Sequence, residues 1–199
     1  IVTHGYSLID NYIKNLPDFK GNIDDLGGPS ANMYGMDCDK CSGNCIDCKT
    51  LDRSHSRIIH LLQKVRKISG IKKIFIRSGI RYDLVNDDYI KELKHHISGT
   101  LKIAPEHVSK NVLELMNKDK GNLDEFIKKF KKYGCGELAF YFMVAHPGSS
   151  MKEAKELEKK FGHLRNTNSV QIFTPTPMTN STCMYYTGIN PKTKKQIYV

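Results

Sequence analysis

The stretch ELAFYFMVAHPG, residues 137–148, decides the fold class of this chain. Most of it is a continuous apolar run, the most apolar strand pattern in the sequence, and it closes with histidine, proline and glycine. A helix is predicted on each side of it. Asn122 and Glu125 have the spacing of a capping box before FIKKFKKY, and Ser150 and Glu153 have the same spacing before the next amphipathic segment. The stretch is therefore a predicted strand between two helices.

The same alternation of strand and helix patterns covers the rest of the 199 residues. Alternation of this kind requires parallel strands joined by right-handed crossovers, in an open doubly wound sheet or in part of a β/α barrel. Asp87 and Ser109 are the expected N-terminal caps of two of the helices. The predicted strands are residues 19–26, 72–79, 99–107, 137–148 and 169–177, and the predicted helices are residues 7–16, 57–68, 88–97, 110–118, 126–133 and a segment that begins after residue 150.

Length and composition indicate a globular chain that folds as a single domain over residues 1–199. The sequence is 39% hydrophobic and 26% charged, which is ordinary for a folded protein and unlike a disordered one. A chain of this length buries a substantial core without help from disulfides. No apolar run approaches the roughly 18–20 residues that a membrane span needs, so we expect no membrane association.

The carboxyl ends of the predicted strands are all polar or rich in glycine and proline. Because the active edge of a parallel sheet lies at the carboxyl ends of its strands, ends that carry arginine, glutamate, aspartate and two histidines indicate a small-molecule site. One such end alone would mean nothing, because loops need glycine and proline anyway. The five ends are Asp25–Pro29, Ser78–Asp83, Ala104–His107, Ala145–Gly148 and Thr174–Pro177.

Four of the six cysteines lie in residues 36–50, as C-x2-C-x3-C-x2-C. Four thiolates satisfy a tetrahedral ion completely, which is the arrangement of a structural zinc site. The same thiolates could hold an auxiliary iron–sulfur cluster, or they could hold no metal and form disulfides or thiols. The clustered spacing, with no visible signal peptide, favours a metal and a cytoplasmic location. The four predicted ligands are Cys38, Cys41, Cys45 and Cys48.

The formal net charge of +10 leaves two interpretations open. A basic surface is typical of nucleic-acid binding, so a zinc-knuckle module that binds RNA is one alternative. Many of the lysines, however, lie opposite an apolar helical stripe, as in EFIKKFKKY, where they are expected to be a solvated face. A third alternative is an unrelated α/β enzyme that binds a phosphorylated ligand at GGPSAN, residues 27–32. That loop lacks the Lys-Ser/Thr ending of a P-loop.

Several long motifs resemble the YgiQ family of radical SAM proteins, and they cover nearly the whole chain. The resemblance implies a partial (β/α)6 barrel that opens onto S-adenosylmethionine (SAM). It also implies a four-iron–four-sulfur cluster in the parent protein, which cleaves SAM reductively into methionine and a 5′-deoxyadenosyl radical. It does not imply a substrate. The stretches that carry the resemblance are DLGGPSANMY (25–34), DRSHSRIIHLLQKVRKISGIKKIFIRSGIRYDL (52–84), GTLKIAPEHVSKNVLELMNK (99–118), YFMVAHPGS (141–149) and IFTPTPMTNSTCMYYTG (172–188).

The chain departs from the radical SAM pattern in its cysteines. The radical cluster needs a CxxxCxxC loop after the first barrel strand, whereas the cysteines here follow the strand that ends in Gly27-Gly28. Cys41, Cys45 and Cys48 match CxxxCxxC in bare spacing, but their position argues against that role. The resemblance therefore implies that the chain begins after the catalytic cysteines, lacks the first strand and is inactive alone. About five barrel strands and a four-cysteine insertion are then expected.

The resemblance assigns roles to residues of the second and third strands. Gly27 and Gly28 match the glycine pair of the family, whose backbone contacts the SAM amino group. The alternative is that the two glycines only form a turn. Pro29 stands where many relatives have an acidic residue, although Asp25 is nearby. Ser78 and Arg81 end the next strand and are candidates for binding the cofactor. The Arg81 guanidinium could clamp the methionine carboxylate, or it could pair with Asp83.

The later strands supply the remaining candidates. Glu106 could accept hydrogen bonds from the ribose hydroxyls, or it could simply favour a helix entry. His107 could bind substrate or transfer a proton, and His146 either points into the site or caps a turn. Glu106, His107 and His146 are therefore the catalytic candidates. Val144 is expected to pack against adenine, and the backbone at Phe173 is expected to read its edge.

Overall fold

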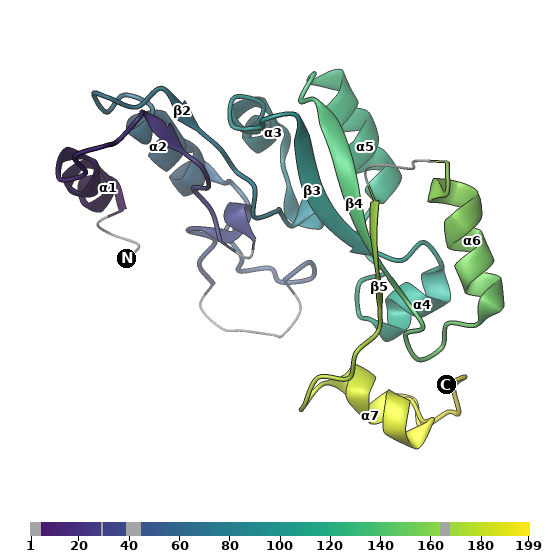
Figure 1. The fold of residues 1–199 in the computed structure, drawn as a ribbon. Coiled ribbons are helices and arrows are strands. Elements are labelled where there is room, and N and C mark those ends of the chain that lie inside the picture. The colour runs from purple at the N-terminus through teal and green to yellow at the C-terminus, as the bar shows by residue number, and fades with distance from the viewer. Residues whose placement is uncertain (1–4, 29, 39–44, 164–167) are drawn as a thin grey trace. The chain divides into compact units, whose positions relative to one another are not determined.

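The structure is a computed structural model that describes residues 5–28, 30–38, 45–163 and 168–199. It divides into two compact units. Unit 1 comprises Ile1–Ile103 and Asn122–Leu138, and unit 2 comprises Ala104–Gly121 and Ala139–Val199. Cys41 and Pro29 lie outside the described residues. The elements of both units are labelled in Figure 1.

Unit 1 contains a small parallel sheet and most of the helices of the first half of the chain. Strand β1 (Asn22–Ile23) pairs in parallel with β2 (Lys73–Ile74), with Asn22 opposite Lys73. The Phe75 amide donates to the Ile23 carbonyl (2.9 Å), and the Leu26 amide donates to the Phe75 carbonyl (2.8 Å). The helices of unit 1 are α1 (Gly5–Lys14), the 3-10 turns η1 (Ala31–Met33) and η2 (Tyr82–Leu84), α2 (Ser56–Val65), α3 (Asp87–Leu93) and α5 (Leu123–Lys132).

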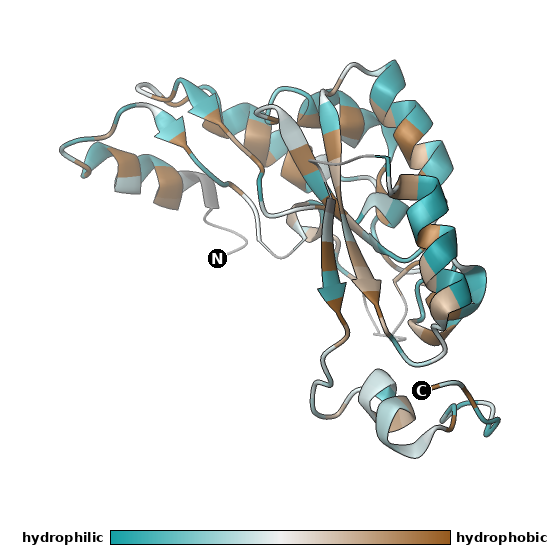
Figure 2. Cartoon of the chain, turned by 45° about the vertical axis from the view of Figure 1, so that its right-hand side comes forward, coloured by the Kyte–Doolittle hydropathy of each residue, from teal (hydrophilic) through white to brown (hydrophobic). Residues whose placement is uncertain are grey.

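The core of unit 1 forms where the apolar faces of its helices meet its strands. Leu62, Val65, Ile90 and Leu93 on α2 and α3 are fully buried, and Ile74 on β2 is nearly so. Burying one such side chain contributes about 1.5–3 kcal/mol. Hydrophobic and hydrophilic residues alternate along the helices in Figure 2. This pattern is expected for helices that bury one face and expose the other to solvent.

Unit 2 is built on the three-stranded sheet with order β3-β4-β5. Strands β3 (Thr100–Glu106) and β4 (Glu137–Val144) continue into unit 2 from unit 1, and β5 (Asn168–Ile172) pairs in parallel with β4. The Phe161 ring of α6 packs 4.9 Å from the rings of both Phe140 and Phe142. The helices of unit 2 are α4 (Lys110–Leu115), α6 (Met151–Phe161) and α7 (Asn180–Thr187).

The structure confirms an α/β fold with parallel sheets of two and three strands. It also confirms the predicted capping of α5 and α6. Asn122 Oδ1 accepts from the Glu125 amide (3.0 Å), and Ser150 with Glu153 forms a complete capping box. No helix among the described residues is both long and apolar enough to cross a membrane.

Some sequence-based expectations were wrong in detail. The cap of α3 is Asn86, whose side chain accepts from the Tyr89 amide, rather than Asp87. Ser109 is at the N-cap position of α4, as predicted, but its side chain makes no capping hydrogen bond. Strands β1 and β2 have two residues each and are shorter than the predicted strands at 19–26 and 72–79. Beyond Ile23 and Ile74 the two segments are joined by isolated hydrogen bonds and do not form a regular ladder.

Helix α7 was not predicted at all. Its sequence, NSTCMYYT, has no apolar stripe, and among its described side chains only Met184 is buried. The helix instead depends on its ends. The Thr179 hydroxyl accepts from the Thr182 amide (3.2 Å), and Gly188 closes the helix in the left-handed conformation.

Candidate functional site

The two glycines after β1 occupy different environments in unit 1. A Cβ atom on Gly27 would lie 2.3 Å from Ser78 Oγ and 3.2 Å from Asp25 Oδ1, so only glycine fits there. A Cβ atom on Gly28 would meet no described atom within 4 Å apart from its chain neighbours. The first glycine is therefore required by the packing of the protein itself, whereas the backbone of the second faces open space.

Asp25 and Ser78 join the glycine loop to the end of the neighbouring strand. Asp25 Oδ1 accepts from the Arg77 amide (3.0 Å) and from the Ser78 hydroxyl (3.1 Å). The carboxylate thus holds the two strand ends together. It is also exposed, so it remains within reach of a bound group.

Asn32 closes the same loop from the other side, and the sequence analysis missed it. Its amide oxygen accepts from the Arg81 amide (2.8 Å), and its amide nitrogen donates to the Arg81 carbonyl (2.9 Å). The Asn32 side chain is 0% exposed. The Ala31 amide adds a hydrogen bond to the Gly79 carbonyl (3.1 Å). Together these contacts fix Ala31 and Asn32 against the segment that follows β2.

Arg81 forms an ion pair with Asp83. Its Nε donates to Asp83 Oδ1 (2.8 Å) and its terminal nitrogen donates to Oδ2 (2.5 Å). This hydrogen bonding raises the pKa of Arg81 against the opposing effect of burial, and the nearby Cys45 adds to the increase. Of the two readings left open by the sequence, the ion pair is present. A carboxylate ligand would have to use the remaining N–H groups of the guanidinium.

The described part of the cysteine loop is held by arginines. One terminal nitrogen of Arg53 donates to the carbonyls of Cys45 (3.1 Å), Ile46 (2.5 Å) and Cys48 (3.3 Å). At the base of the loop, Arg57 pairs with Asp37, and the Asp52 amide donates to the Asp37 carbonyl (3.2 Å). A small cluster of buried apolar residues supports the loop; it consists of Met36, Leu51 and Leu84, with Met33, Ile46, Cys45 and Cys48 packed against it.

The predicted metal ligands are only partly described, since Cys41 lies outside the described residues. Cys38 is exposed, and Cys45 and Cys48 are half-buried. Among the described residues, no three His, Cys, Asp or Glu side chains are gathered closely enough to hold a metal ion. Four thiolates still fit a soft ion by their chemistry. Binding would therefore draw the thiolates together, as is usual when metal binding and local folding are coupled.

Unit 2 places Glu106 at the end of β3 in an unusual backbone conformation. Its φ angle is 68°, in the left-handed region that side chains rarely adopt, and Ala145 at the end of β4 has a φ of 57°. Glu106 Oε1 pairs with Lys118 Nζ (2.7 Å). Its other carboxylate oxygen, Oε2, is buried and has no hydrogen-bond partner among the described residues.

His107 follows directly and is 1% exposed. Its Nδ1 accepts from the Ser109 amide (3.0 Å), so in the neutral ring the proton is on Nε2. Burial lowers the pKa of His107, the nearby Glu156 and Glu153 oppose that shift, and the ring is neutral at pH 7. Nε2 is a buried donor without a partner among the described residues.

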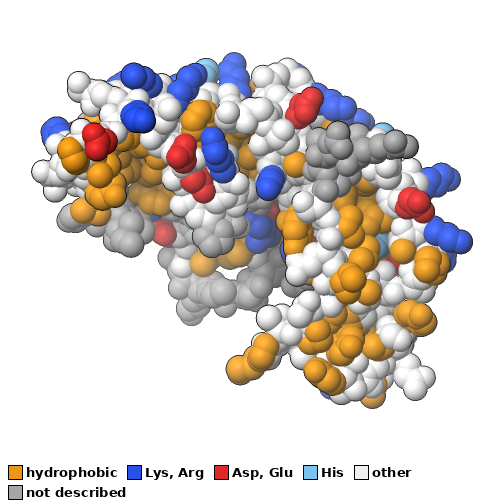
Figure 3. Space-filling model, in the orientation of Figure 1, with side chains coloured by type: hydrophobic (Ala, Val, Ile, Leu, Met, Phe, Trp, Pro, Cys, Tyr) orange, Lys and Arg blue, Asp and Glu red, His pale blue; other side chains and the backbone are white. Residues whose placement is uncertain are grey.

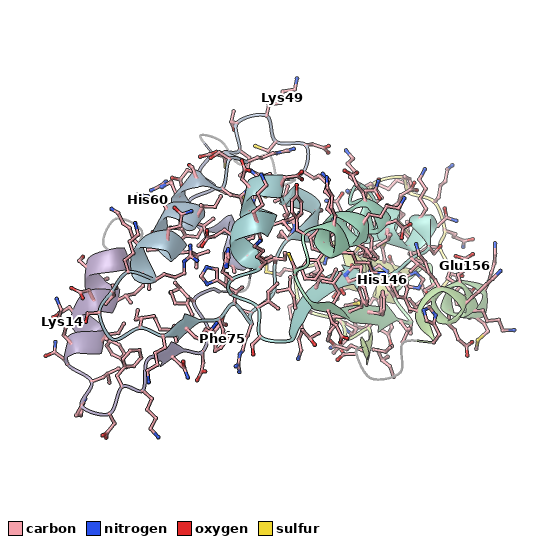
Figure 4. The ribbon with its side chains drawn as sticks, turned by 90° about the horizontal axis from the view of Figure 1, so that it is seen from above. Lys14, Lys49, His60, Phe75, His146 and Glu156 are labelled. Carbon is pink, nitrogen blue, oxygen red and sulfur yellow. The ribbon has the colours of Figure 1, made fainter. Side chains whose placement is uncertain are left out.

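His146 is 2% exposed and both of its ring nitrogens are occupied. Nδ1 donates to the Pro147 carbonyl (2.8 Å), and Nε2 lies 2.8 Å from Ser181 Oγ. The Phe173 ring meets the imidazole edge-on at 5.1 Å. Burial lowers the pKa of His146, against the opposing effects of the Pro147 carbonyl and of Glu106. Figure 4 labels His146 among the side chains of unit 2. Sequence analysis missed Ser181, which lies 35 residues from its partner.

Val144 and Phe173 are joined through their backbones, because the Phe173 amide donates to the Val144 carbonyl (2.8 Å). The amide of Phe173 is therefore already used. Its carbonyl is the backbone group that remains for reading the edge of a base. The Phe173 ring also packs 5.9 Å from the Tyr185 ring of α7.

Comparisons with known proteins add relatives but no activity. No protein-family model matches the chain. The chain is 46% identical over 209 residues to a UPF0313 protein of Methanocaldococcus jannaschii, which matches 93% of this chain and 34% of the relative. It is 45% identical over 203 residues to a UPF0313 protein of Methanosarcina acetivorans, covering 92% and 27% respectively. A UPF0313 protein of Clostridium botulinum is 46% identical over 213 residues, covering 95% and 33%. The chain thus spans about a third or less of the length of these relatives.

Proposed function

We propose that this chain is one domain of a radical SAM protein of the YgiQ type, folded as part of a (β/α)6 barrel, and that its residues bind SAM. The motif resemblance along the chain supports the family, and the parallel α/β architecture is compatible with the barrel. When bound, SAM and the cluster of the parent protein supply a 5′-deoxyadenosyl radical. The proposal assigns no ligand of that cluster to this chain.

A single observation in unit 2 carries the proposal of a bound small molecule. Two neighbouring residues, Glu106 and His107, each leave a buried polar atom without a partner among the described residues. Native proteins leave few such atoms, and each costs about 1–3 kcal/mol when it stays unpaired. The left-handed backbone at Glu106 adds strain at the same place. A ligand group that accepts from His107 Nε2, or one that donates to Glu106 Oε2, would remove part of this cost, and a ribose hydroxyl can act in either way.

The proposed roles in unit 1 rest on the open face of Gly28. Its backbone can approach the methionine part of SAM because, chain neighbours apart, no described atom lies within 4 Å of the place where a Cβ atom would be. Asp25 is exposed beside it and would accept from the SAM amino group. Arg81, held by Asp83, retains N–H groups for the SAM carboxylate. Ser78 positions Asp25 rather than contacting the ligand in this scheme.

Alanine substitutions at the two glycines test this function. We expect Gly28→Ala to weaken SAM binding at least tenfold, measured by equilibrium dialysis with labelled SAM under anaerobic conditions, with an unchanged thermal unfolding midpoint. Gly27→Ala is the matched control: it clashes with Ser78 and should lower the unfolding midpoint. Wild-type affinity in Gly28→Ala would refute the assignment in unit 1. Wild-type affinity in Glu106→Gln would refute the assignment in unit 2.

We also propose that Cys38, Cys41, Cys45 and Cys48 bind a structural zinc ion, with an auxiliary iron–sulfur cluster as the alternative. The supporting observations are the donor set and the arginine contacts that shape the loop. Anaerobically purified protein should contain one zinc per chain and be colourless, and Cys45→Ser should lose the metal. Cys183→Ser, an exposed cysteine outside the loop, is the control. Iron with sulfide and visible absorption would establish the cluster instead, and metal-free protein would end the proposal.

The alternative of a nucleic-acid-binding module gains no support from the lysines of α5. Lys129 pairs with both Asp87 (3.4 Å) and Glu125 (3.1 Å) of unit 1, so its charge is already partly neutralised within the protein. Figure 3 shows lysine and arginine side chains dispersed over the visible face. RNA binding with a strong salt dependence would revive this alternative.

A further inference from the structure

We propose that Ser181 and His146 form a nucleophile–base pair that cleaves short-chain carboxylic esters in a pocket of unit 2. This activity goes beyond SAM binding and does not depend on it. All the residues concerned lie in unit 2, on α4 and α7 and in the segments that follow β4, α4 and α7.

The protonation of His146 is fixed by its partners. The Pro147 carbonyl can only accept a hydrogen bond, so Nδ1 carries the ring proton (2.8 Å). The neutral ring then has its lone pair on Nε2, and the Ser181 hydroxyl 2.8 Å away donates to it. A hydroxyl that donates to an imidazole, which is itself oriented by a third group, is the arrangement of an activated serine nucleophile.

His146 is also neutral at pH 7, as a general base has to be. Burial lowers the pKa of His146 from the ordinary value of 6.5. Two titratable groups lie near the ring, one at the end of β3 and one directly after it. Glu106 raises the pKa of His146 but less strongly than burial lowers it, and His107 is itself a neutral imidazole. His146 is therefore available as a proton acceptor at pH 7.

Ser181 lines a pocket of about 230 Å³. This is smaller than the roughly 300–1,000 Å³ of sites for drug-sized ligands, so the pocket fits a short acyl group. Its walls combine the apolar side chains of Leu115, Met116 and Met184 with the polar groups of Asn117 and Lys192 and with the carboxylate of Glu114, which pairs with Lys110 (3.8 Å). Lys192 Nζ donates to Asn117 Oδ1 (3.2 Å), which fixes a positive charge at this wall.

The first turn of α7 adds groups that would stabilise negative charge. Ser181 is the second residue of the helix, after the cap Thr179 and the first residue Asn180. The amides at the start of a helix have no intrahelical acceptor, and the helix dipole is positive at that end. Asn180 and Ser181 both line the pocket, so an oxyanion that forms on a substrate there would meet this positive end.

The reaction balances without any cofactor. Ser181 Oγ attacks the ester carbonyl carbon while its proton passes to His146 Nε2. The bond to the leaving alcohol breaks, and the alcohol takes that proton. Water then attacks the acyl-serine, with its proton again passing through His146, which releases the carboxylic acid and restores Ser181.

Covalent labelling tests the pair directly. Wild-type protein treated with a fluorophosphonate should gain one adduct per chain, located by mass spectrometry at Ser181. Ser181→Ala should gain none, and His146→Gln should react roughly 100-fold more slowly, the loss expected when a general base is removed. Ser98→Ala, an exposed serine of unit 1, should react like the wild type. An unlabelled wild-type protein, or an adduct at another serine, would overturn the proposal.

Two further measurements keep the test decisive if His146→Gln fails to fold. The labelling rate of the wild type should be constant above pH 7 and fall only below pH 6.5, as the base becomes protonated. p-Nitrophenyl acetate should be turned over in a Cys183→Ser background, which removes the exposed thiol two residues from Ser181. A labelling rate that does not depend on pH, or an absence of turnover, would count against the pair. SAM binding should be unaffected in Ser181→Ala, so that failure of this proposal is distinct from failure of the SAM proposal.

Discussion

The glycine loop of unit 1 and the strand ends of unit 2 differ in how their polar groups are satisfied. In unit 1, Asp25 accepts from Ser78, Asn32 exchanges two hydrogen bonds with Arg81, and Arg81 pairs with Asp83. In unit 2, Glu106 Oε2 and His107 Nε2 are buried without partners among the described residues. The first region therefore stabilises the fold by itself, whereas the second leaves hydrogen-bonding capacity unused among the described residues.

The largest expected effect on stability tests whether hydrogen bonds within the protein stabilise the glycine loop of unit 1. Asn32→Leu would leave the amide and carbonyl of Arg81 without their partner, and we expect a loss of roughly 2–4 kcal/mol in the free energy of unfolding. Urea unfolding measures it. Asn11→Ala, at an exposed position of α1, should change stability by less than about 0.5 kcal/mol. Equal losses of stability at Asn32 and Asn11 would show that the glycine loop does not depend on the hydrogen bonds of Asn32.

A double substitution sharpens the same comparison at Gly27. Gly27→Ala should cost about 1–3 kcal/mol, because the new methyl group would overlap Ser78 Oγ. Ser78→Ala should restore part of that loss, since it removes the atom that clashes. Unfolding of the two single variants and the double variant gives the coupling between the sites. Strictly additive effects would show that the clash is relieved elsewhere.

Acid should weaken the protein through histidines that both units hold neutral. Burial lowers the pKa values of His55 in unit 1 and of His107 and His146 in unit 2. Below pH 6.5 the unfolded chain binds protons that the folded rings do not, so stability is complete above that pH and is lost as the pH falls. Urea unfolding at pH 7.5 and 5.5 should show the loss. His107→Asn, which keeps an acceptor for the Ser109 amide, should show a smaller one; an equal loss would exclude His107 as a contributor.

The smallest effect on stability is expected at Glu106, whose Oε2 has no hydrogen-bond partner among the described residues. Glu106→Gln keeps an oxygen for Lys118 and exchanges an ion pair with a half-exposed lysine for a neutral hydrogen bond. We expect a stability change below about 1 kcal/mol in urea unfolding. The same substitution should weaken SAM binding, because Oε2 is the orphaned acceptor. A large destabilisation without any change in binding would assign Glu106 a structural role only.

Local signals predicted much of this fold. The capping residues Asn122 and Ser150 marked helices that the structure contains, and the apolar run at 137–144 is β4. Polar residues at the strand ends pointed to Glu106, His107 and His146, and two of these carry orphaned atoms. These features depend on neighbours within a few positions, so the sequence displays them directly.

The features that were missed depend on distant partners. Asn32 lies 49 residues from Arg81, and Ser181 lies 35 residues from His146, so no short-range pattern marks either one. Helix α7 lacks an apolar stripe and depends on Thr179 and Gly188 at its ends. The roles proposed for Val144 and Phe173 remain predictions for the same reason, since they concern a ligand and not a local pattern.

In many cysteine-rich loops the fold depends on metal binding, whereas Arg53 shapes part of this loop without an ion. Its guanidinium gathers the carbonyls of Cys45, Ile46 and Cys48, so this turn is shaped by a side chain of the protein itself. The turn from Cys45 to Cys48 would therefore keep its shape in metal-free protein, whereas the exposed Cys38 would still have to move toward it if the proposed ion bound.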